Sequence, residues 1–153
     1  MRIVSFSNYH YFLSNFAPTH VEFDGRMYPT VEHAYQAAKS EDPQVRRVFE
    51  VLPSPRLAKQ RGRAVRLRRD WDTVKVGIMR TLLERKFAPD SEMASKLLRT
   101  GSAELVEGNY WHDNFWGACD CMKCLRTPKQ NVLGTLLMEV RDTLRAGGRR
   151  LDV

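Results

Sequence analysis

Helix-start signals divide the first half of the chain into short segments. Asp42 precedes Pro43 and Ser54 precedes Pro55, so each pair places a side-chain acceptor directly before a proline. The acceptor bonds to an N–H of the first helical turn, and the proline gives up only an N–H that has no helical partner. Thr30 offers the same capping group one helix earlier. The chain is therefore predicted to form a run of short helices.

Longer helices and a small β element are expected around this run. Apolar residues at helical spacing predict three further helices, at residues 72–87, 90–99 and 131–145. Short strands are expected at residues 2–6 and 103–107, with a hairpin at 20–28 that turns at Asp24-Gly25. Val74, Ile78 and Leu82 form the expected stripe of the first long helix, and Gly147 is expected to end the last one. The predicted fold class is mainly α (α+β), as a single domain over residues 1–153.

Charge makes anionic partners the expected class. The formal net charge is +7, which favours phosphates, nucleotides or nucleic acid. No apolar run approaches the roughly 18 residues that a membrane-spanning helix needs. The N-terminus, MRIVSFSNYHYF, lacks the basic-then-apolar pattern of a signal peptide. We therefore expect a cytoplasmic protein without a membrane partner.

The segment TVEHAYQAAK (Thr30–Lys39) has two faces if it is helical. Its apolar stripe consists of Val31, Ala34, Tyr35 and Ala38. Glu32, Gln36 and Lys39 lie at i, i+4 and i+7, so they share a second face. Two interpretations of that face stay open: a solvated polar surface, or a surface that meets a ligand lying across the helix. His33 points off this face, and we interpret it as a hydrogen-bonded structural residue rather than a catalyst.

Residues 109–117, NYWHDNFWG, place Asp113 among four aromatic rings. Aromatic faces stack on bases, and a carboxylate in a dry pocket interacts strongly with developing positive charge. Asp113 is therefore a candidate catalytic carboxylate on a loop. A second interpretation stays equally open, in which the aromatic residues are core and Asp113 caps a turn.

Residues 56–69 carry seven cations and no acid. A run of this kind forms either a solvated face or a phosphate site. Arginine's planar fork suits bidentate contact with phosphate, and Trp71 follows directly as a surface on which a base can stack. No glycine-rich phosphate loop occurs in the sequence.

The chain's three cysteines, Cys119, Cys121 and Cys124, follow the spacing CxCxxC. Their odd number argues against a disulfide framework. They are either three reduced thiols in a loop or three of the four ligands of a structural zinc ion, with the fourth from His112, Asp120 or elsewhere. No histidine is obviously placed as the base of a catalytic cysteine.

Seven segments in a fixed order carry a family resemblance. They are LSNFAP (13–18), FDGRMYPTVEHAYQAAK (23–39), PSPRLAKQRGRAVRLRRDWD (53–72), KFAPD (86–90), LLRTGSAELVEGN (97–109), DNFWG (113–117) and NVLGTLLMEVR (131–141). Together they resemble the NADAR (YbiA-like) family across essentially the whole chain. The resemblance implies a compact, mostly helical fold and N-glycosidase activity. Family substrates include ribosylated pyrimidine intermediates of riboflavin biosynthesis and, in some members, ADP-ribose attached to guanine.

The resemblance implies catalytic roles for Glu32, Lys39 and Asp113. Together with the helix face, it assigns substrate contacts to Asn15, Phe16, Gln36, Arg63, Arg68, Trp71, Trp116 and Asn131. One carboxylate would stabilise the oxocarbenium-like charge and the other would position water. Lys39 would either hold a hydroxyl or phosphate as a cation, or form a Schiff base as a neutral amine. The segment TPKQN (127–131) departs from the tryptophan and glycine that many relatives carry there, which bears on substrate preference.

Two other functions stay open. One is a non-catalytic module that binds ADP-ribose or an NAD-like ligand. The other is a nucleic-acid-binding protein that uses residues 56–69, which predicts steep salt dependence. Acids at both 32 and 113 favour cleavage, because a module that only binds an anion gains little from two carboxylates. The expected enzyme requires no cofactor, and a structural zinc ion at the cysteines stays an open alternative.

Overall fold

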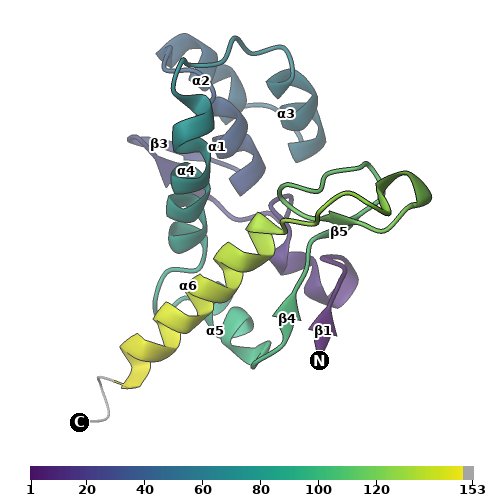
Figure 1. Ribbon diagram of the computed structural model, residues 1–153. Helices are drawn as coiled ribbons and strands as arrows, with labels where there is room; N and C mark the ends of the chain where they lie inside the picture. Colours follow the sequence, from purple (N-terminus) through teal and green to yellow (C-terminus); the bar gives the residue numbers. More distant parts are fainter. Residues whose placement is uncertain (150–153) are drawn as a thin grey trace. The chain divides into compact units, whose positions relative to one another are not determined.

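The computed structural model describes residues 1–149, and the chain folds into two compact units. One unit comprises Asn15–Lys86, and the other combines Met1–Ser14 with the chain from Phe87 onward. The single domain predicted over residues 1–153 therefore stays a prediction. Helices dominate and the strands are short (Figure 1), so the predicted mainly α (α+β) class is confirmed.

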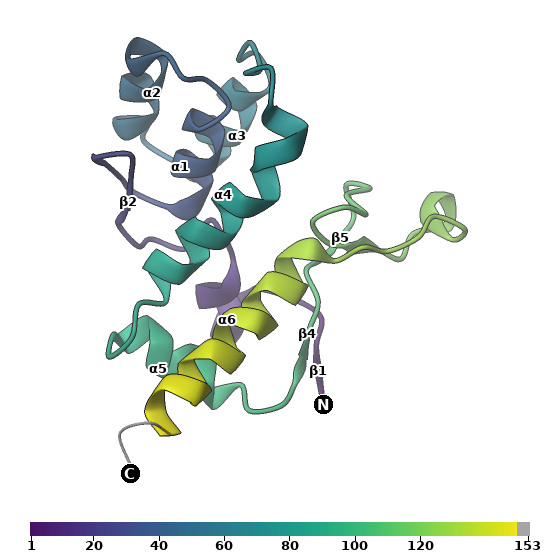
Figure 2. The same ribbon diagram turned by 60° about the vertical axis from the view of Figure 1, so that its left-hand side comes forward.

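The Asn15–Lys86 unit consists of one hairpin and four helices. They are β2 (Val21–Phe23), β3 (Arg26–Tyr28), α1 (Val31–Ala37), α2 (Pro43–Glu50), α3 (Pro55–Gly62) and α4 (Trp71–Lys86). Asp24 and Gly25 both have positive φ, 49° and 80°, as a two-residue turn between antiparallel strands requires. The predicted hairpin is confirmed. Helix α1 is central, because it contacts α2, α3 and α4 (Figure 2).

The predicted helix starts are also confirmed. The side chains of Thr30, Asp42 and Ser54 each accept a hydrogen bond from a backbone N–H in the first turn of the helix that follows. Pro43 and Pro55 occupy the first helical positions. These contacts are local, so the chain makes them wherever the helices pack.

Helix α4 matches the predicted helix, but its buried stripe differs from the predicted one. The buried residues are Trp71, Met79, Leu82, Leu83 and Lys86. Leu82 is buried as expected, whereas Val74 and Ile78 are only half-buried. The predicted stripe is wrong at these two positions. The apolar residues of α4 are spread over several sides of the helix. Packing against α1 and β2 decides which of these sides is buried.

The other unit has short strands, two helices and two 3₁₀ turns. They are β1 (Arg2–Ile3), η1 (Asn8–Leu13), α5 (Glu92–Arg99), β4 (Glu104–Leu105), β5 (Gly108–Asn109), β6 (Ala118–Cys119), η2 (Met122–Cys124) and α6 (Val132–Arg149). β1 pairs with β4 and β5 pairs with β6, each pair parallel. Helix α6 contacts α5 and β4. No helix within residues 1–149 has both the length and the apolar character to cross a bilayer.

Gly101 and Gly147, which lie near the ends of α5 and α6, behave differently. Gly101 has φ +65° and follows the last turn of α5, as a glycine cap does. Gly147 was expected to end the last helix, but α6 continues through it to Arg149. That expectation is wrong, because Gly147 does not take the positive φ by which a glycine cap turns the chain out of a helix.

Candidate functional site

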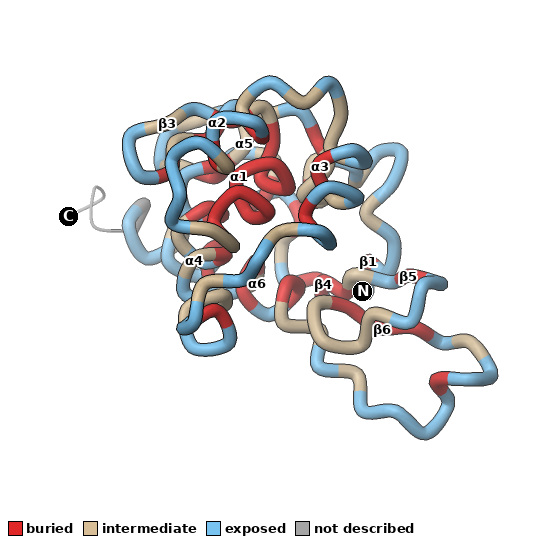
Figure 3. The backbone as a smooth tube through the Cα atoms, turned by 90° about the horizontal axis from the view of Figure 1, so that it is seen from above, coloured by how far each residue is buried: buried red, intermediate tan, exposed pale blue. Residues whose placement is uncertain are grey.

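The polar side chains of α1 are buried. Glu32 is 7% exposed and Gln36 is 5% exposed, and Figure 3 shows α1 as a buried segment. A carboxylate in such a place loses hydration and needs hydrogen bonds in return. Gln36 Nε2 donates one to Glu32 Oε1 at 2.8 Å. The solvated interpretation is therefore wrong for Glu32 and Gln36, because α2, α3 and α4 contact the short helix, whereas Lys39 is half-buried.

Gln36 lies directly against the end of α3. A Cβ added to Gly62 would lie 1.8 Å from Gln36 Oε1, so only glycine fits beside this amide. Gln36 Oε1 is buried and has no hydrogen-bond partner among residues 1–149. Buried acceptors are nearly always satisfied, so this oxygen marks a place for a donor from water or a ligand.

Lys39 lies two residues beyond α1 and turns toward the same groups. Its Nζ donates to the carbonyl oxygen of Gly62 at 3.3 Å. Burial lowers the pKa of Lys39; the Glu32 carboxylate opposes this shift and the Arg63 guanidinium adds to it. The net lowering makes the neutral amine more accessible than on a solvated lysine.

Asn15, which precedes Phe16 in the sequence, is hydrogen-bonded to the first turn of α1. The backbone carbonyl of Asn15 accepts the N–H of Glu32 at 3.1 Å, which fixes Asn15 at the start of α1. Its Nδ2 donates to Met79 Sδ at 3.6 Å. Its Oδ1 is buried without a partner in the part of the chain that the structure describes. Phe16 is half-buried. Asn15 thus presents a second buried acceptor beside the Glu32 turn.

His33 has the structural role expected for it. Its Nε2 donates to the carbonyl oxygen of Leu52 at 3.0 Å, and its Nδ1 lies 2.7 Å from the hydroxyl oxygen of Thr30. The ring is 1% exposed, and burial lowers its pKa. Both nitrogens thus serve the protein's own hydrogen bonds.

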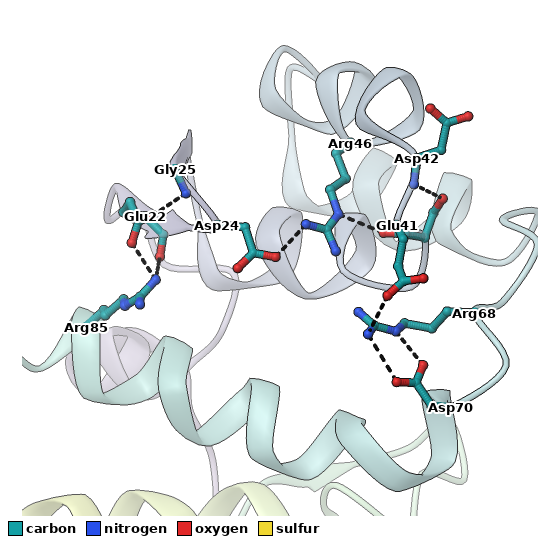
Figure 4. A network of polar contacts seen from close by, with 10 residues as sticks. Glu22, Asp24, Gly25, Glu41, Asp42, Arg46, Arg68, Asp70 and Arg85 are labelled. Atoms are coloured by element: carbon teal, nitrogen blue, oxygen red, sulfur yellow. Dashed lines mark hydrogen bonds and ion pairs between the residues drawn. The ribbon is translucent and has the colours of Figure 1, made fainter.

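Of the predicted substrate contacts, Trp71 and Arg68 are both engaged by other residues of the protein. Trp71 is 6% exposed and packs on the Tyr35 ring, with ring centroids 5.1 Å apart. Figure 4 shows the Arg68 guanidinium between Asp70, at 2.6 Å, and Glu41, at 2.9 Å. A phosphate at Arg68 would compete with both carboxylates.

Arg68 also forms a backbone hydrogen bond with Lys39. Other arginines of the basic run are more exposed than Arg68. The backbone N–H of Arg68 donates to the carbonyl oxygen of Lys39 at 2.8 Å. Arg63 is exposed. A pocket of about 380 Å³ beside Arg68 is also lined by Arg66 and Arg69, which sequence reasoning did not single out from the basic run. Both of these side chains are exposed.

Asp113 lies in the other unit, on the loop between β5 and β6. Its Oδ1 accepts the N–H groups of Phe115 at 3.1 Å and Trp116 at 2.9 Å, which confirms that Asp113 caps a turn. The expectation that the aromatic residues of this segment are core is wrong for Tyr110 and Trp111, which are 87% and 52% exposed. The carboxylate is half-buried, and its Oδ2 takes no part in these two bonds. Trp116 is also half-buried and meets the Phe115 ring edge-on at 4.9 Å.

Asn131 uses its side chain to hold the backbone. Its Nδ2 donates to the Leu105 carbonyl oxygen at 2.9 Å, and its Oδ1 accepts the Glu107 N–H at 3.0 Å. These bonds pair both polar groups of the amide with the last residue of β4 and with the backbone that links β4 to β5. A substrate contact by Asn131 stays a prediction.

The three cysteines meet His112 in what we call the cysteine–histidine cluster. The four ligand atoms all lie within 4.8 Å of one another. Of the alternatives left open by the sequence, the fold selects His112, while the Asp120 side chain is exposed and lies outside the cluster. The donor set is that of a metal-binding site.

Comparisons with known proteins agree with this fold. The NADAR domain model matches residues 3–145. N-glycosidase YbiA of Escherichia coli is 38% identical over 133 residues, covering 86% of this chain and 79% of that protein. An N-glycosidase of Nostoc punctiforme is 39% identical over 137 residues, covering 86% and 84%. A riboflavin biosynthesis protein of Vibrio vulnificus is 36% identical over 143 residues, covering 88% of this chain and 36% of that protein.

The fold is also that of a solved relative. The NMR structure of Escherichia coli YbiA matches with a TM-score of 0.78 at 34% identity, covering 97% of this chain and 89% of that one. The family model, the sequence relatives and the structural match all extend over most of the chain. The chain therefore belongs to the NADAR domain family.

Proposed function

We propose that this protein hydrolyses the N-glycosidic bond of a phosphorylated ribosyl-base compound, with Glu32 and Lys39 as its reactive groups. The reaction class follows from the NADAR domain and from N-glycosidase relatives that are 38% and 39% identical. The observation that carries the residue assignment is the buried Glu32 carboxylate, held by Gln36 beside a lysine of lowered pKa.

The proposed first substrate is a ribosylaminopyrimidine phosphate of riboflavin biosynthesis. The riboflavin biosynthesis protein of Vibrio vulnificus, 36% identical to this chain, supports that choice. The exposed arginines of residues 56–69 suit the phosphate of such a compound. Arg63 is the proposed contact, because it is exposed and lies close enough to Lys39 to affect its pKa.

Glu32 would stabilise the charge that develops as the bond breaks. Cleavage of a ribosyl C–N bond leaves positive charge on C1′ and the ring oxygen. A carboxylate that is 7% exposed acts on that charge through a medium of low dielectric, where the interaction is stronger than in water. The hydrogen bond from Gln36 keeps the carboxylate in one orientation without neutralising it.

Lys39 is proposed to act as an amine nucleophile. Its Nζ would attack C1′ of the ring-opened sugar and form a C–N bond, while the bond from C1′ to the base breaks and the base leaves with a proton. Water would then hydrolyse the imine, releasing ribose 5-phosphate and restoring the amine. Sodium borohydride added during turnover is expected to leave a reduced sugar adduct on Lys39, detected by mass spectrometry. Turnover without any adduct would favour direct attack by water, with Lys39 as a cation.

Site variants test the assignment. Turnover of the ribosylaminopyrimidine 5′-phosphate, followed as release of ribose 5-phosphate, is expected to fall about 10²–10³-fold in Glu32→Gln and in Lys39→Ala. Asp113→Asn tests the role that the sequence resemblance proposes for that loop. Glu84→Gln is the matched control, since Glu84 is exposed on α4. If all three site variants turn over substrate at the wild-type rate, the assignment fails.

A second substrate, ADP-ribose attached to guanine in nucleic acid, has its own support. The net charge is +7, and Arg56, Arg61, Arg63, Arg66 and Arg69 are all exposed within one segment. Release of ADP-ribose from such nucleic acid should then fall steeply as salt rises, because each phosphate contact releases counterions. Tight binding of ADP-ribose with no turnover of either substrate would favour the non-catalytic alternative. The proposed reaction draws on water and side chains alone and needs no cofactor.

A further inference from the structure

The cysteine–histidine cluster has the dimensions of a tetrahedral metal site. Three thiolates about 2.3 Å and one imidazole nitrogen about 2.05 Å from a zinc ion lie roughly 3.6–3.8 Å from one another. In this fold His112 Nδ1 lies 3.2 Å, 3.3 Å and 3.7 Å from the sulfurs of Cys121, Cys124 and Cys119. No pair of the four atoms is more than 4.8 Å apart. Changes of up to about 1 Å in the distances between these atoms would therefore accommodate the ion.

Hydrogen bonding among the four side chains does not account for this convergence. One imidazole N–H donates to a single acceptor in good geometry, and thiols are weak donors and weak acceptors. The three cysteines are free thiols. His112 has φ 67°, a left-handed conformation that a residue other than glycine keeps only where its surroundings hold it. Four soft or borderline donors aimed at one point are what a cation requires.

We propose that His112, Cys119, Cys121 and Cys124 bind one structural zinc ion, and that this ion holds the loop that carries Asp113. Three thiolates and one imidazole form a common donor set of structural zinc sites, and thiolate ligands favour zinc over magnesium or calcium. Four protein ligands complete a tetrahedron and leave no position for substrate, so the ion is structural. Backbone geometry supports the ligands, because Cys121 starts the short turn η2 and its carbonyl oxygen accepts the Cys124 N–H at 3.0 Å.

The ion would fix both ends of the loop. His112 directly precedes Asp113, and Cys119 lies in β6 at the far end of the loop. Asn114 Oδ1 accepts the Cys119 N–H at 2.9 Å, which adds a hydrogen bond behind one ligand. The effect on catalysis rests on the proposed function together with the role that the family resemblance implies for Asp113, which Asp113→Asn tests.

The same loop also supports the start of α6. The backbone carbonyls of Phe115 and Trp116 accept the N–H groups of Val132 and Leu133, each at 3.0 Å. These N–H groups belong to the first turn of α6, where no carbonyl of the helix itself is available to accept them. Metal on one side and the helix start on the other would leave the segment between His112 and Cys119 little freedom.

Metal analysis of the whole chain tests the site. Protein expressed with zinc should contain one zinc per chain, and cobalt exchanged for zinc should show the visible absorption of tetrahedral, thiolate-bound Co²⁺. His112→Ala and Cys121→Ser should lose the metal on dialysis against a chelator, whereas Cys121→His should retain it because four ligands remain. Asp120→Ala and His20→Ala are matched controls and should keep one zinc. A wild-type chain without zinc and without cobalt absorption overturns the proposal, as does loss of metal in Asp120→Ala but not in His112→Ala.

Hydrogen exchange tests the effect on the loop separately from activity. Chelation of the wild-type protein should speed exchange of the Phe115 and Trp116 N–H groups, while exchange within α5 (Glu92–Arg99) stays unchanged. Equal acceleration in α5, or none in the loop, overturns the loop-holding role.

Turnover links the ion to the proposed function. Zinc removal should lower kcat about 10–100-fold, and added zinc should restore it. Metal-free protein that keeps its full kcat overturns the positioning role and leaves Glu32 and Lys39 unaffected. Zinc-bound protein with a protected loop but no turnover supports the metal site and refutes the proposed function.

Discussion

Replacement of Gly62 by alanine probes the contact on which the buried carboxylate depends. The new Cβ would lie 1.8 Å from Oε1, 2.4 Å from Cδ and 3.0 Å from Cγ of Gln36, where ordinary contacts begin at 3.4 Å. The Gln36 oxygen would therefore have to move by at least 3.4 − 1.8 = 1.6 Å. Oε1 and Nε2 belong to one planar amide, so we expect the movement to draw Nε2 away from Glu32 Oε1, which lies 2.8 Å from it.

The expected cost follows from that broken bond. A hydrogen bond to a charged group contributes about 1.5–3 kcal/mol. Alanine in a helix returns about 0.5–1 kcal/mol relative to glycine. The net effect of Gly62→Ala on the free energy of unfolding should be a loss of about 1–2 kcal/mol, measured by urea denaturation. Gly77→Ala is the matched control. A Cβ there would meet no described atom within 4 Å, apart from chain neighbours and helix backbone, so the control should gain about 0.5–1 kcal/mol.

A double variant separates the clash from other effects of the alanine. With Gln36→Ala in place the obstructing atoms are absent, so adding Gly62→Ala should become neutral or stabilising. Gly62→Ala should also lower kcat to a similar extent as Gln36→Ala, because both changes release the Glu32 carboxylate. A Gly62→Ala protein as stable as the wild type, or a double variant in which the two losses simply add, would refute the reasoning.

Three further substitutions test the packing. Burial lowers the pKa of Lys86 to about 7 from 10.5, so the unfolded chain binds one more proton between those pH values and stability should rise with pH by up to about 1.4 kcal/mol per unit. Lys86→Met should flatten that slope in urea titrations across the window, and an unchanged slope would assign it to other groups. Asn131→Ala leaves the Glu107 N–H and the Leu105 carbonyl without their bonds, so a loss of about 2–4 kcal/mol is expected by chemical denaturation; a loss below about 0.5 kcal/mol would contradict this. Gly25→Ala should cost about 1–2 kcal/mol, because φ is +80° with open space around the Cβ; a calorimetric Tm equal to wild type would show that the turn relaxes.

Features whose partners lie close in sequence were predictable. Thr30 accepts the N–H of His33, three residues away, and the Asp24-Gly25 turn closes a hairpin of two short strands. Such contacts depend only on the local backbone, so the residue types at these positions predict them. The NADAR resemblance rested on a longer co-linear pattern, and the comparisons confirm it.

Features that depend on packing were not predictable in the same way. The spacing of Glu32, Gln36 and Lys39 put them on one face, but only the neighbouring helices made that face a buried one. The approach of Gly62 to Gln36 joins residues far apart in sequence and follows no period, so no pattern signals it. The end of α6 was not predictable from Gly147 either, because glycine permits the left-handed conformation of a helix cap without requiring it.

The cysteine–histidine cluster depends partly on local sequence and partly on the tertiary fold. The sequence by itself determined the CxCxxC spacing, which indicates either three reduced thiols or three ligands of a metal ion, and it left a fourth ligand open between His112, Asp120 and other residues. Side chains on an extended segment alternate in direction, so Asp120, between two ligands, is directed away from them and is exposed. The tertiary fold brought His112 to the sulfurs, because the pairing of β5 with β6 places Asn109, three residues before His112, beside Cys119.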